Sequence, residues 1–318
     1  MKRKINTRRL IVNLCLIGLS TFIALALCEI GLRIAGYRYE GNQERMTFCR
    51  YDPVLGWSHR PGKEGRFETL GFSTRVKINR RGLRDIEHDY RKAKGTMRIL
   101  VLGDSFVWGY GVEIDEALTR RMEASLKNCE VINAGVSGYS TDQELLWLEK
   151  EGVKYEPDLI ILVLSHNDIL ANTENRVYGF YYKPTFLLGS TGSLELTNTP
   201  VPHFPVAIDR AYWLVRTSSL AYFLALRLTD VWAAMGSLWE PQSSRIDYAV
   251  RLTVALVSRM RDIARRHKAR FLVAAYCQDF VPCRRVVDAL RTDKFSLIDL
   301  SGAPGWSRKN MVIDSEGH

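Results

Sequence analysis

Residues 98–111 read RILVLGDSFVWGYG, and this stretch decides how the rest of the chain can fold. The run from Ile99 to Gly103 is apolar and ends in glycine, which is typical of a short, buried strand in a parallel sheet. Asp104 and Ser105 follow directly, at the strand end where open parallel sheets carry their chemistry. Ser105 is therefore either a nucleophile with room around it or the ordinary cap of a following helix.

Two more apolar runs end in polar residues in the same way. Residues 130–135 read EVINAG, and residues 158–168 read DLIILVLSHND. Neighbouring parallel strands bring their carboxyl ends to one edge of a sheet, so the groups after the three runs should lie close together.

These three blocks, GDSF, NAG and the polar cluster with Asn167, resemble the signature of the SGNH (GDSL-type) hydrolase family. The resemblance extends over residues 98–318. It implies that Ser105 is the nucleophile of acyl-ester cleavage. It also implies an oxyanion hole made of the backbone N–H groups of Ser105 and Gly135 and the side chain of Asn167. This chemistry needs no cofactor.

The segments between the strands predict the outer layers. Helical patterns cover residues 115–127, 141–151 and 246–268, the second starting with a capping box and the third with apolar residues three and four apart. Two later apolar runs, 271–276 and 295–300, are the fourth and fifth strands. This alternation predicts parallel strands with right-handed crossovers. We expect a three-layer α/β/α sandwich with a five-stranded parallel sheet, flavodoxin-like as in SGNH hydrolases, preceded by one transmembrane helix.

A serine nucleophile needs a base, and the base needs an orienting acid. Of the six histidines, His318 lies past the fifth strand, where its loop can return over Ser105. The resemblance also implies that the base comes last in the chain, closely preceded by an acid. Asp314 and Glu316 both lie within reach of His318, and we rank Asp314 first. Members of the family continue with a helix here, so either more chain follows His318 or the base is loosely held.

Residues 10–28 form an uncharged run of nineteen residues, close to the length that spans the ~30 Å hydrocarbon core of a bilayer. Residues 1–9 carry five basic side chains and no acid, half of the formal net charge of +10, and should stay in the cytoplasm. The run is longer than the core of a signal peptide, so we expect an uncleaved anchor over 10–30 rather than a cleaved leader. The catalytic domain would then lie on the periplasmic or extracellular side of the inner (cytoplasmic) membrane.

Composition excludes two further classes of protein. The chain is 46% hydrophobic and 25% charged, which is typical of a packed core and not of global disorder. Beyond the leader, no dense basic stripe with interleaved aromatic residues is present, so we expect no nucleic-acid partner.

The regions flanking the strands are harder to interpret. Residues 31–97 predict a small β-rich extension, and residues 171–240 an insertion within the 98–318 domain. Residues 78–85 read INRRGLRD and resemble a stretch that precedes the GDS strand in membrane-anchored members. Their arginines either meet anionic substrate or headgroups, or belong to a solvated turn. The apolar stretch 212–239 is either an amphipathic helix packed on the sheet or a helix at the membrane surface.

Cys277 and Cys283 are six residues apart and can close a loop by a disulfide, which an oxidising exterior would permit. No Cys-x-x-Cys pair and no His/Cys cluster has the spacing of a zinc site, so we predict no metal.

The sequence thus predicts a membrane-anchored serine esterase that acts through an acyl-Ser105 intermediate. Its expected partners are an acylated glycan or another acyl-ester substrate, and the membrane through its N-terminal helix. O-deacetylation of a cell-envelope polysaccharide is the first candidate reaction. An acyltransferase to a glycan and a lysophospholipase would use the same residues, and a non-catalytic, membrane-anchored glycan-binding or assembly module is the alternative from another class.

Overall fold

The structure is a computed structural model of the 318-residue chain. The residues that it describes are 7–37, 43–69, 71–177, 181–203, 213–215, 217–236, 242–277 and 279–302. The first six residues of the basic leader lie outside these ranges, as do Asp314, Glu316 and His318.

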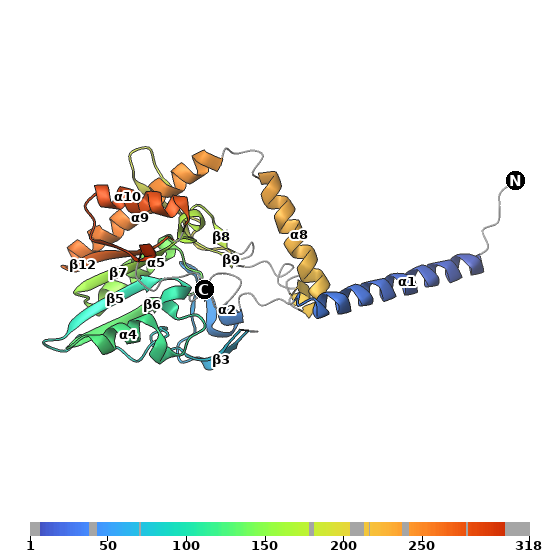
Figure 1. The fold of residues 1–318 in the computed structure, drawn as a ribbon, viewed down its shortest axis with the longest axis horizontal. Coiled ribbons are helices and arrows are strands. Elements are labelled where there is room, and N and C mark those ends of the chain that lie inside the picture. Colours follow the sequence, from blue (N-terminus) through green and yellow to red (C-terminus); the bar gives the residue numbers. More distant parts are fainter. Residues whose placement is uncertain are drawn as a thin grey trace. The chain divides into compact units, whose positions relative to one another are not determined.

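A five-stranded parallel sheet forms the centre of the larger of two compact units (Figure 1). Its strands are β5 (Met97–Gly103), β6 (Cys129–Gly135), β7 (Leu159–Ser165), β12 (Arg270–Tyr276) and β13 (Leu297–Asp299). They pair in the order β13-β12-β7-β5-β6, and every neighbouring pair is parallel. The second strand along the chain is at one edge and the first lies inside, which is the flavodoxin-like order. The predicted fold class and all five strands are confirmed.

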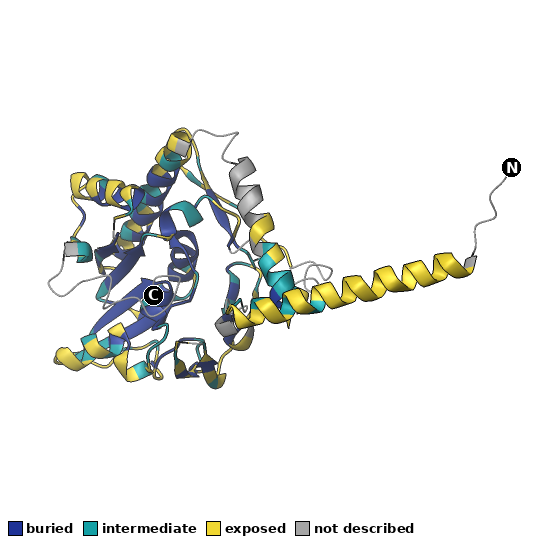
Figure 2. Ribbon diagram, turned by 45° about the vertical axis from the view of Figure 1, so that its right-hand side comes forward, coloured by how far each residue is buried: buried dark blue, intermediate teal, exposed yellow. Residues whose placement is uncertain are grey.

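Helices cover both faces of this sheet. One layer contains α5 (Thr141–Lys150), α9 (Gln242–Arg266) and α10 (Val281–Thr292), and the other α3 (Ser105–Trp108) and α4 (Leu118–Ser125). Strand β5 serves both layers because its side chains alternate: Leu100 and Leu102 pack towards the first, Ile99 and Val101 towards the second. Figure 2 shows the resulting buried centre between two half-exposed helical layers.

The predicted helices are present with small shifts at their ends. A short 3-10 turn over Ile114–Glu116 precedes α4, so that helix begins later than the pattern indicated. Two further 3-10 turns cover Gly152–Tyr155 and Leu300–Gly302, and a four-residue helix, α6 (Asp168–Ala171), follows β7.

The segment before the sheet forms two antiparallel hairpins after a short helix. They are α2 (Gln43–Phe48), β1 (Cys49–Asp52) with β2 (Gly56–His59), and β3 (Glu64–Glu68) with β4 (Ser73–Lys77). Both belong to the compact unit of the sheet. The first hairpin shares the core of the sheet through Leu55 and Trp57, whereas Phe67 and Val76 of the second pack in a separate apolar cluster with Trp108. Trp57 donates from its indole to Ser137 O (3.3 Å), and Gln143 donates to Leu55 O (2.7 Å).

Two more hairpins follow β7. They are β8 (Arg176–Val177) with β9 (Tyr181–Tyr182), and β10 (Thr185–Leu188) with β11 (Leu194–Thr197). Lys183 lies between them and is fully buried, where its ammonium bonds the equally buried carboxylate of Asp142. A charged pair taken entirely out of water is tolerated only with both partners present, so this contact ties the hairpins to α5.

A second compact unit contains α1 (Thr7–Ile34) and α8 (Ser219–Gly236). Within α1, Arg8 to Ile34 is long and apolar enough to cross a membrane by length and composition, and none of the residues in its most apolar 18-residue window is buried. Helix α8 lies within the predicted apolar stretch 212–239, and within this unit it contacts α1.

Candidate active site

The nucleophile candidate sits on the first turn after β5. Asp104 follows the strand, and its side chain accepts the backbone N–H of Phe106 (3.0 Å), which caps the short helix α3. Ser105 is the first residue of that helix and is 4% exposed. Helix α3 ends at Gly109, which has a left-handed φ of +86° that few other residues would adopt.

The carboxyl end of β7 meets this turn through one hydrogen bond. Asn167 is exposed, and its side-chain N–H donates to Asp104 Oδ2 at 3.0 Å. Asp168 accepts the backbone N–H of Ser165 (2.8 Å), which fixes the turn that carries Asn167. The prediction that strand ends bring Ser105 and Asn167 together is therefore met through Asp104, the neighbour of Ser105.

Gly135 ends strand β6, as the sequence predicted. Its backbone N–H donates to Asn133 Oδ1 at 2.9 Å, so the protein itself already uses this donor. A Cβ at this position would lie 2.3 Å from Trp108 N and 2.7 Å from Val107 C. Glycine is thus required here because α3 packs directly on β6, and Gly135 is fully buried.

The next glycine along the same loop, Gly138, is half-buried and has φ of +73°. Arg45 packs against it, so closely that a Cβ on Gly138 would lie 1.8 Å from Arg45 Nη2. The Arg45 guanidinium lies over the rings of both Trp57 (4.5 Å) and Tyr181 (4.9 Å). The loop after β6 therefore has a fixed backbone and one glycine at its surface.

Residues 78–88 hold both strand ends in place, a role that sequence reasoning missed. Arg84 is fully buried and donates to the carbonyls of Trp108 (3.1 Å), Gly109 and Val112 (2.6 Å). Burial lowers the pKa of Arg84 to about 10, so it stays charged at neutral pH. Arg84 is thus neither an anion contact nor part of a solvated turn: it fixes the backbone that follows the Ser105 helix.

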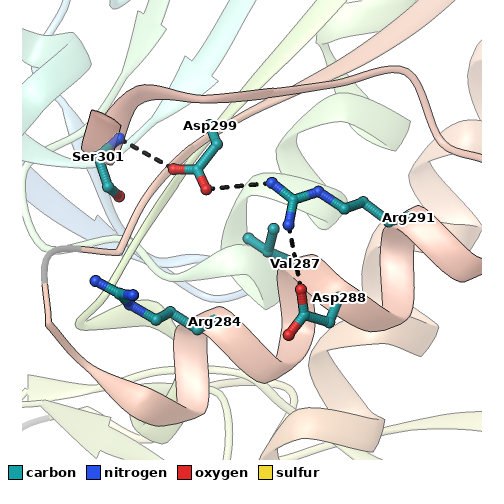
Figure 3. Close-up of a pocket in the computed structure, with 6 residues that line it drawn as sticks. All are labelled: Arg284, Val287, Asp288, Arg291, Asp299 and Ser301. Carbon is teal, nitrogen blue, oxygen red and sulfur yellow. Dashed lines mark hydrogen bonds and ion pairs between the residues drawn. The ribbon is translucent and has the colours of Figure 1, made fainter. Parts of the chain in front are cut away.

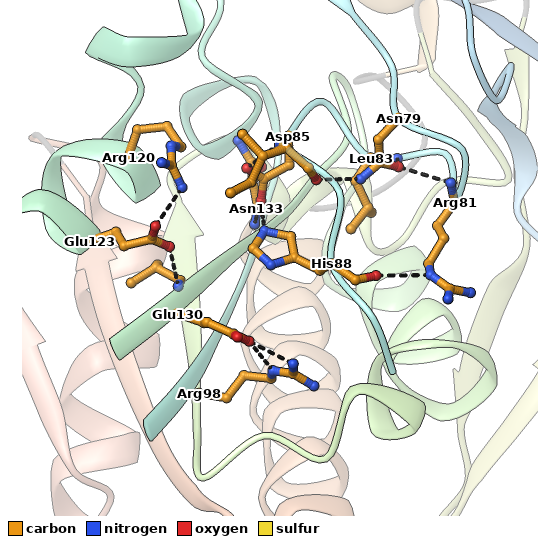
Figure 4. Close-up of polar contacts among 12 residues, drawn as sticks. Asn79, Arg81, Leu83, Asp85, His88, Arg98, Arg120, Glu123, Glu130 and Asn133 are labelled. Atoms are coloured by element: carbon orange, nitrogen blue, oxygen red, sulfur yellow. Dashed lines mark hydrogen bonds and ion pairs between the residues drawn. The ribbon is translucent and has the colours of Figure 1, made fainter. Parts of the chain in front are cut away.

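Its neighbour Asp85 does the same for β6 (Figure 4). Asp85 Oδ2 accepts the backbone N–H of Asn133 (2.7 Å) and faces His88 Nε2 (3.1 Å). Asn133 in turn donates its side-chain N–H to Val107 O (2.9 Å) and accepts from Gly135. A chain of hydrogen bonds therefore runs from Asp85 through Asn133 to both α3 and the end of β6.

Acidic side chains lie buried beneath the site. Glu144 and Asp168 are each 1% exposed, and burial raises the pKa of both carboxyls well above their usual range. The negative charges of Asp104 and Asp142 raise the pKa of Glu144 further. Neither side-chain oxygen of Glu144 has a hydrogen-bond partner among the described residues. Glu144 is therefore held as a neutral acid.

Aromatic rings gather where β5, β7 and β12 end. Phe106 contacts Tyr276 (centroids 5.3 Å apart), and His166 contacts Tyr276 (6.3 Å) and Phe280 (6.4 Å). Cys277 and Cys283 form a disulfide, which closes the loop that carries Phe280. Ser105 and Asn167 thus have ring-bearing neighbours on three strand ends.

The expected base and its acid fall outside the described residues, since His318, Asp314 and Glu316 are all in 303–318. Two other histidines have structural places. His59 is buried, bonds Gly82 O (2.9 Å), and has its pKa lowered to about 4 by burial. His88 is buried against Asp85.

Within the described ranges, no group of three or more His, Cys, Asp or Glu side chains could hold a metal ion. Figure 3 shows a separate hollow of about 320 Å³ beside α10. Its lining residues are Arg284, Val287, Asp288, Arg291, Asp299 and Ser301. Arg291 bonds both Asp288 (3.2 Å) and Asp299 (3.3 Å), and Arg284 pairs with Asp279. The positive charges of both arginines are therefore already compensated by neighbouring carboxylates.

Comparison with known proteins identifies relatives. The sequence model of the GDSL-like lipase/acylhydrolase family matches residues 101–291. No curated protein matches the chain. Among solved structures, TesA is 14% identical (TM-score 0.35; 67% of this chain and 87% of TesA covered).

Two further solved structures are similar. AlinE4, an SGNH-hydrolase family esterase, is 17% identical with a TM-score of 0.32, covering 65% of this chain and 77% of that one. A lipolytic G-D-S-L family protein from Veillonella parvula is 16% identical with a TM-score of 0.36, covering 64% and 78%.

The Arg84 contacts predict a large effect of Arg84→Lys. A lysine cannot supply the fork of donors that reaches three carbonyls, so the free energy of unfolding should fall by about 3 kcal/mol. Ester hydrolysis should fall by at least about tenfold, because α3 loses its fixed position. Denaturant unfolding and initial rates measure both. Arg80→Lys is the matched control, since the Arg80 side chain is 85% exposed and forms an ion pair with Glu87; an equal effect there would contradict the assignment.

The neutral state of Glu144 predicts a pH dependence of stability. The unfolded chain ionises this carboxyl near pH 4.5, whereas the folded protein keeps it protonated, so stability falls as pH rises above 4.5. The slope is about 1.4 kcal/mol per pH unit up to the folded pKa.

Glu144→Gln should remove this loss, so that the variant gains stability relative to wild type in denaturant unfolding as the pH rises above 4.5. Glu149→Gln on the same helix, at the surface beside Arg259, is the control. A Glu144→Gln variant that loses stability relative to wild type across this range would show that the carboxyl is ionised in the fold.

Proposed function

This chain belongs to the GDSL-like lipase/acylhydrolase family, and on that premise we propose that its substrate is an O-acylated polysaccharide of the cell envelope, cleaved through an acyl-Ser105 intermediate. Membership makes the chain a hydrolase that acts on acyl esters. The single observation that carries the residue assignment is the Asn167–Asp104 hydrogen bond (3.0 Å), which joins the Asn167 turn to the Ser105 turn.

The proposed mechanism begins with attack of Ser105 Oγ on the acyl carbonyl carbon. His318 takes the Ser105 proton and later gives it to the leaving sugar oxygen, with Asp314 or, as second choice, Glu316 orienting the imidazole. Water then attacks the acyl-enzyme with the same base and releases the carboxylic acid. This assignment rests on order in the sequence and on family membership.

Donors must meet the oxygen that becomes negative. We propose the backbone N–H of Ser105 and the second side-chain hydrogen of Asn167, since the first is given to Asp104. The Gly135 N–H could join this oxyanion hole only if its hydrogen bond to Asn133 broke. We therefore assign Gly135 a packing role, which is to let α3 lie close against β6. The N–H of the half-buried Gly138 is the donor that we propose in its place.

Location supports an envelope substrate. We propose that α1 is an uncleaved anchor in the inner (cytoplasmic) membrane, with the basic leader in the cytoplasm and the hydrolase unit outside. The length and composition of Arg8–Ile34 support this orientation, together with the five basic residues of the leader. The disulfide Cys277–Cys283 supports an oxidising compartment.

One observation favours a second candidate. Helix α8 exposes Leu224 and Leu228, and an apolar surface of this kind suits an enzyme whose ester is carried by a lipid. Lysophospholipid hydrolysis by the same residues is therefore the second proposed reaction.

Release of acetate from an O-acetylated polysaccharide and of fatty acid from a lysophospholipid distinguishes the two proposals, with p-nitrophenyl acetate as the general ester. Ser105→Ala should lower all measured hydrolysis by at least about a thousandfold, because the nucleophile is lost. Ser125→Ala, an exposed serine on α4, should keep wild-type rates.

Fatty-acid release without acetate release would exchange the order of the two substrates. Hydrolysis that survives Ser105→Ala would contradict the nucleophile. Folded protein with no hydrolysis of any ester would favour the glycan-binding module.

A further inference from the structure

Helix α8 is fastened by its first turn to the end of α1. The Glu29 carboxylate of α1 accepts the hydroxyl of Ser218 (2.8 Å) and the backbone N–H groups of Ser219 (3.0 Å) and Leu220 (2.9 Å). These are the orphan donors at the start of a helix, and a carboxylate is a favourable partner for them. One side chain of α1 thus acts as the N-terminal cap of α8.

Two further contacts fix the same junction. Arg33, one turn after Glu29, donates to Glu29 (2.7 Å) and to the carbonyl of Thr217 (2.8 Å). The rings of Tyr37 and Phe223 meet edge to face with centroids 5.3 Å apart. In Figures 1 and 2, α8 begins at the C-terminal end of α1 and extends away from it rather than back along it.

The sequence sets the depth of this junction in a bilayer. The uncharged run of residues 10–28 is about 28 Å long as a helix, close to the hydrocarbon thickness of ~30 Å. If this run spans the core, Glu29 and Arg33 lie at the level of the outer headgroups. Helix α8 then begins at that level too, because Glu29 caps it.

The surface of α8 suits that position. Leu224 and Leu228 are four residues apart, so they share one face, and they are 51% and 63% exposed. Just before α8, Trp213 and Leu214 are 61% and 53% exposed. Arg227 is exposed as well, with its guanidinium 5.2 Å from the Phe223 ring centroid. Leucine and tryptophan at the acyl boundary, with arginine among the headgroups, are typical of a helix that lies in the membrane interface.

We propose that α8 is a second membrane-contacting element, which lies in the headgroup region of the outer leaflet with Leu224 and Leu228 towards the acyl chains. Its partner is a phospholipid bilayer, whose acyl chains would receive the exposed side chains of Leu224 and Leu228. The inference rests on the proposed anchoring by α1. It adds that the hydrolase unit is connected to the membrane through both ends of the α1–α8 pair.

Photo-crosslinking of the full chain tests this proposal. A benzophenone amino acid replaces one leucine at a time, at position 224 or 228, in chain reconstituted into vesicles of phosphatidylethanolamine and phosphatidylglycerol. Position 19 in α1 reports on the anchor itself, and Leu126, 46% exposed in the hydrolase unit, is the matched control. Illumination should give at least about tenfold more lipid adduct at 224 and 228 than at 126, because an interfacial helix buries its apolar face at the acyl boundary.

The positions separate the possible failures. Lipid adduct at 19 with only the level of 126 at 224 and 228 would overturn the role of α8 and leave the anchor intact. No lipid adduct at 19 would overturn the anchor and this proposal with it. Crosslinks from 224 or 228 to a second copy of the chain instead of to lipid would replace the bilayer by a dimer contact.

Discussion

The buried guanidinium of Arg84 is the contact on which the geometry of the site depends. It binds three carbonyls that follow the Ser105 helix, at Trp108, Gly109 and Val112. Without it, the buried carbonyl of Trp108 would lose this donor, and an unpaired buried carbonyl costs about 1–3 kcal/mol. Asp85, the next residue, applies the same constraint to β6 through Asn133. A short segment before the sheet therefore fixes two strand ends at once, and its loss should disturb both stability and catalysis.

The acidic side chains around the site differ in their roles because they lie in different surroundings. Asp104 stays engaged by Asn167 and by the Phe106 N–H, so its oxygens orient the neighbouring turns. Deeper in the core, burial raises the pKa of Glu144, and the neighbouring carboxyls raise it further, so that the side chain stays protonated. An ionised Glu144 would be an uncompensated buried charge beneath the Asn167 turn. The same low-polarity surroundings strengthen the hydrogen bonds above it, which favours a rigid site.

The fold was predictable from sequence because each central strand is a local apolar run that a turn residue ends, as at Gly103 and Gly135. Ser105 and Asn167 followed from the same rule. The structural role of Arg84 was not predictable, since its partners are backbone carbonyls more than twenty residues later in the chain. A solvent-exposed turn containing arginine and glycine has the same local sequence pattern. The hydrogen bond from the Gly135 N–H to the Asn133 side chain was missed. A sequence pattern shows which residues end a strand, but it does not show which acceptor each backbone N–H will bind. The hydropathy of the sequence predicted that α8 is a helix but did not show which element it contacts. The hydrogen bonds from the start of α8 to Glu29 show that this element is α1.

The central claim is that Ser105, held by this network, is the nucleophile of an ester hydrolase. The most direct measurement is peptide mass spectrometry of the full chain after reaction with a fluorophosphonate. The account predicts that the adduct is on Ser105, and that Arg84→Lys forms it more slowly than wild type. Folded chain that carries no adduct, or carries it on another serine, would contradict the account.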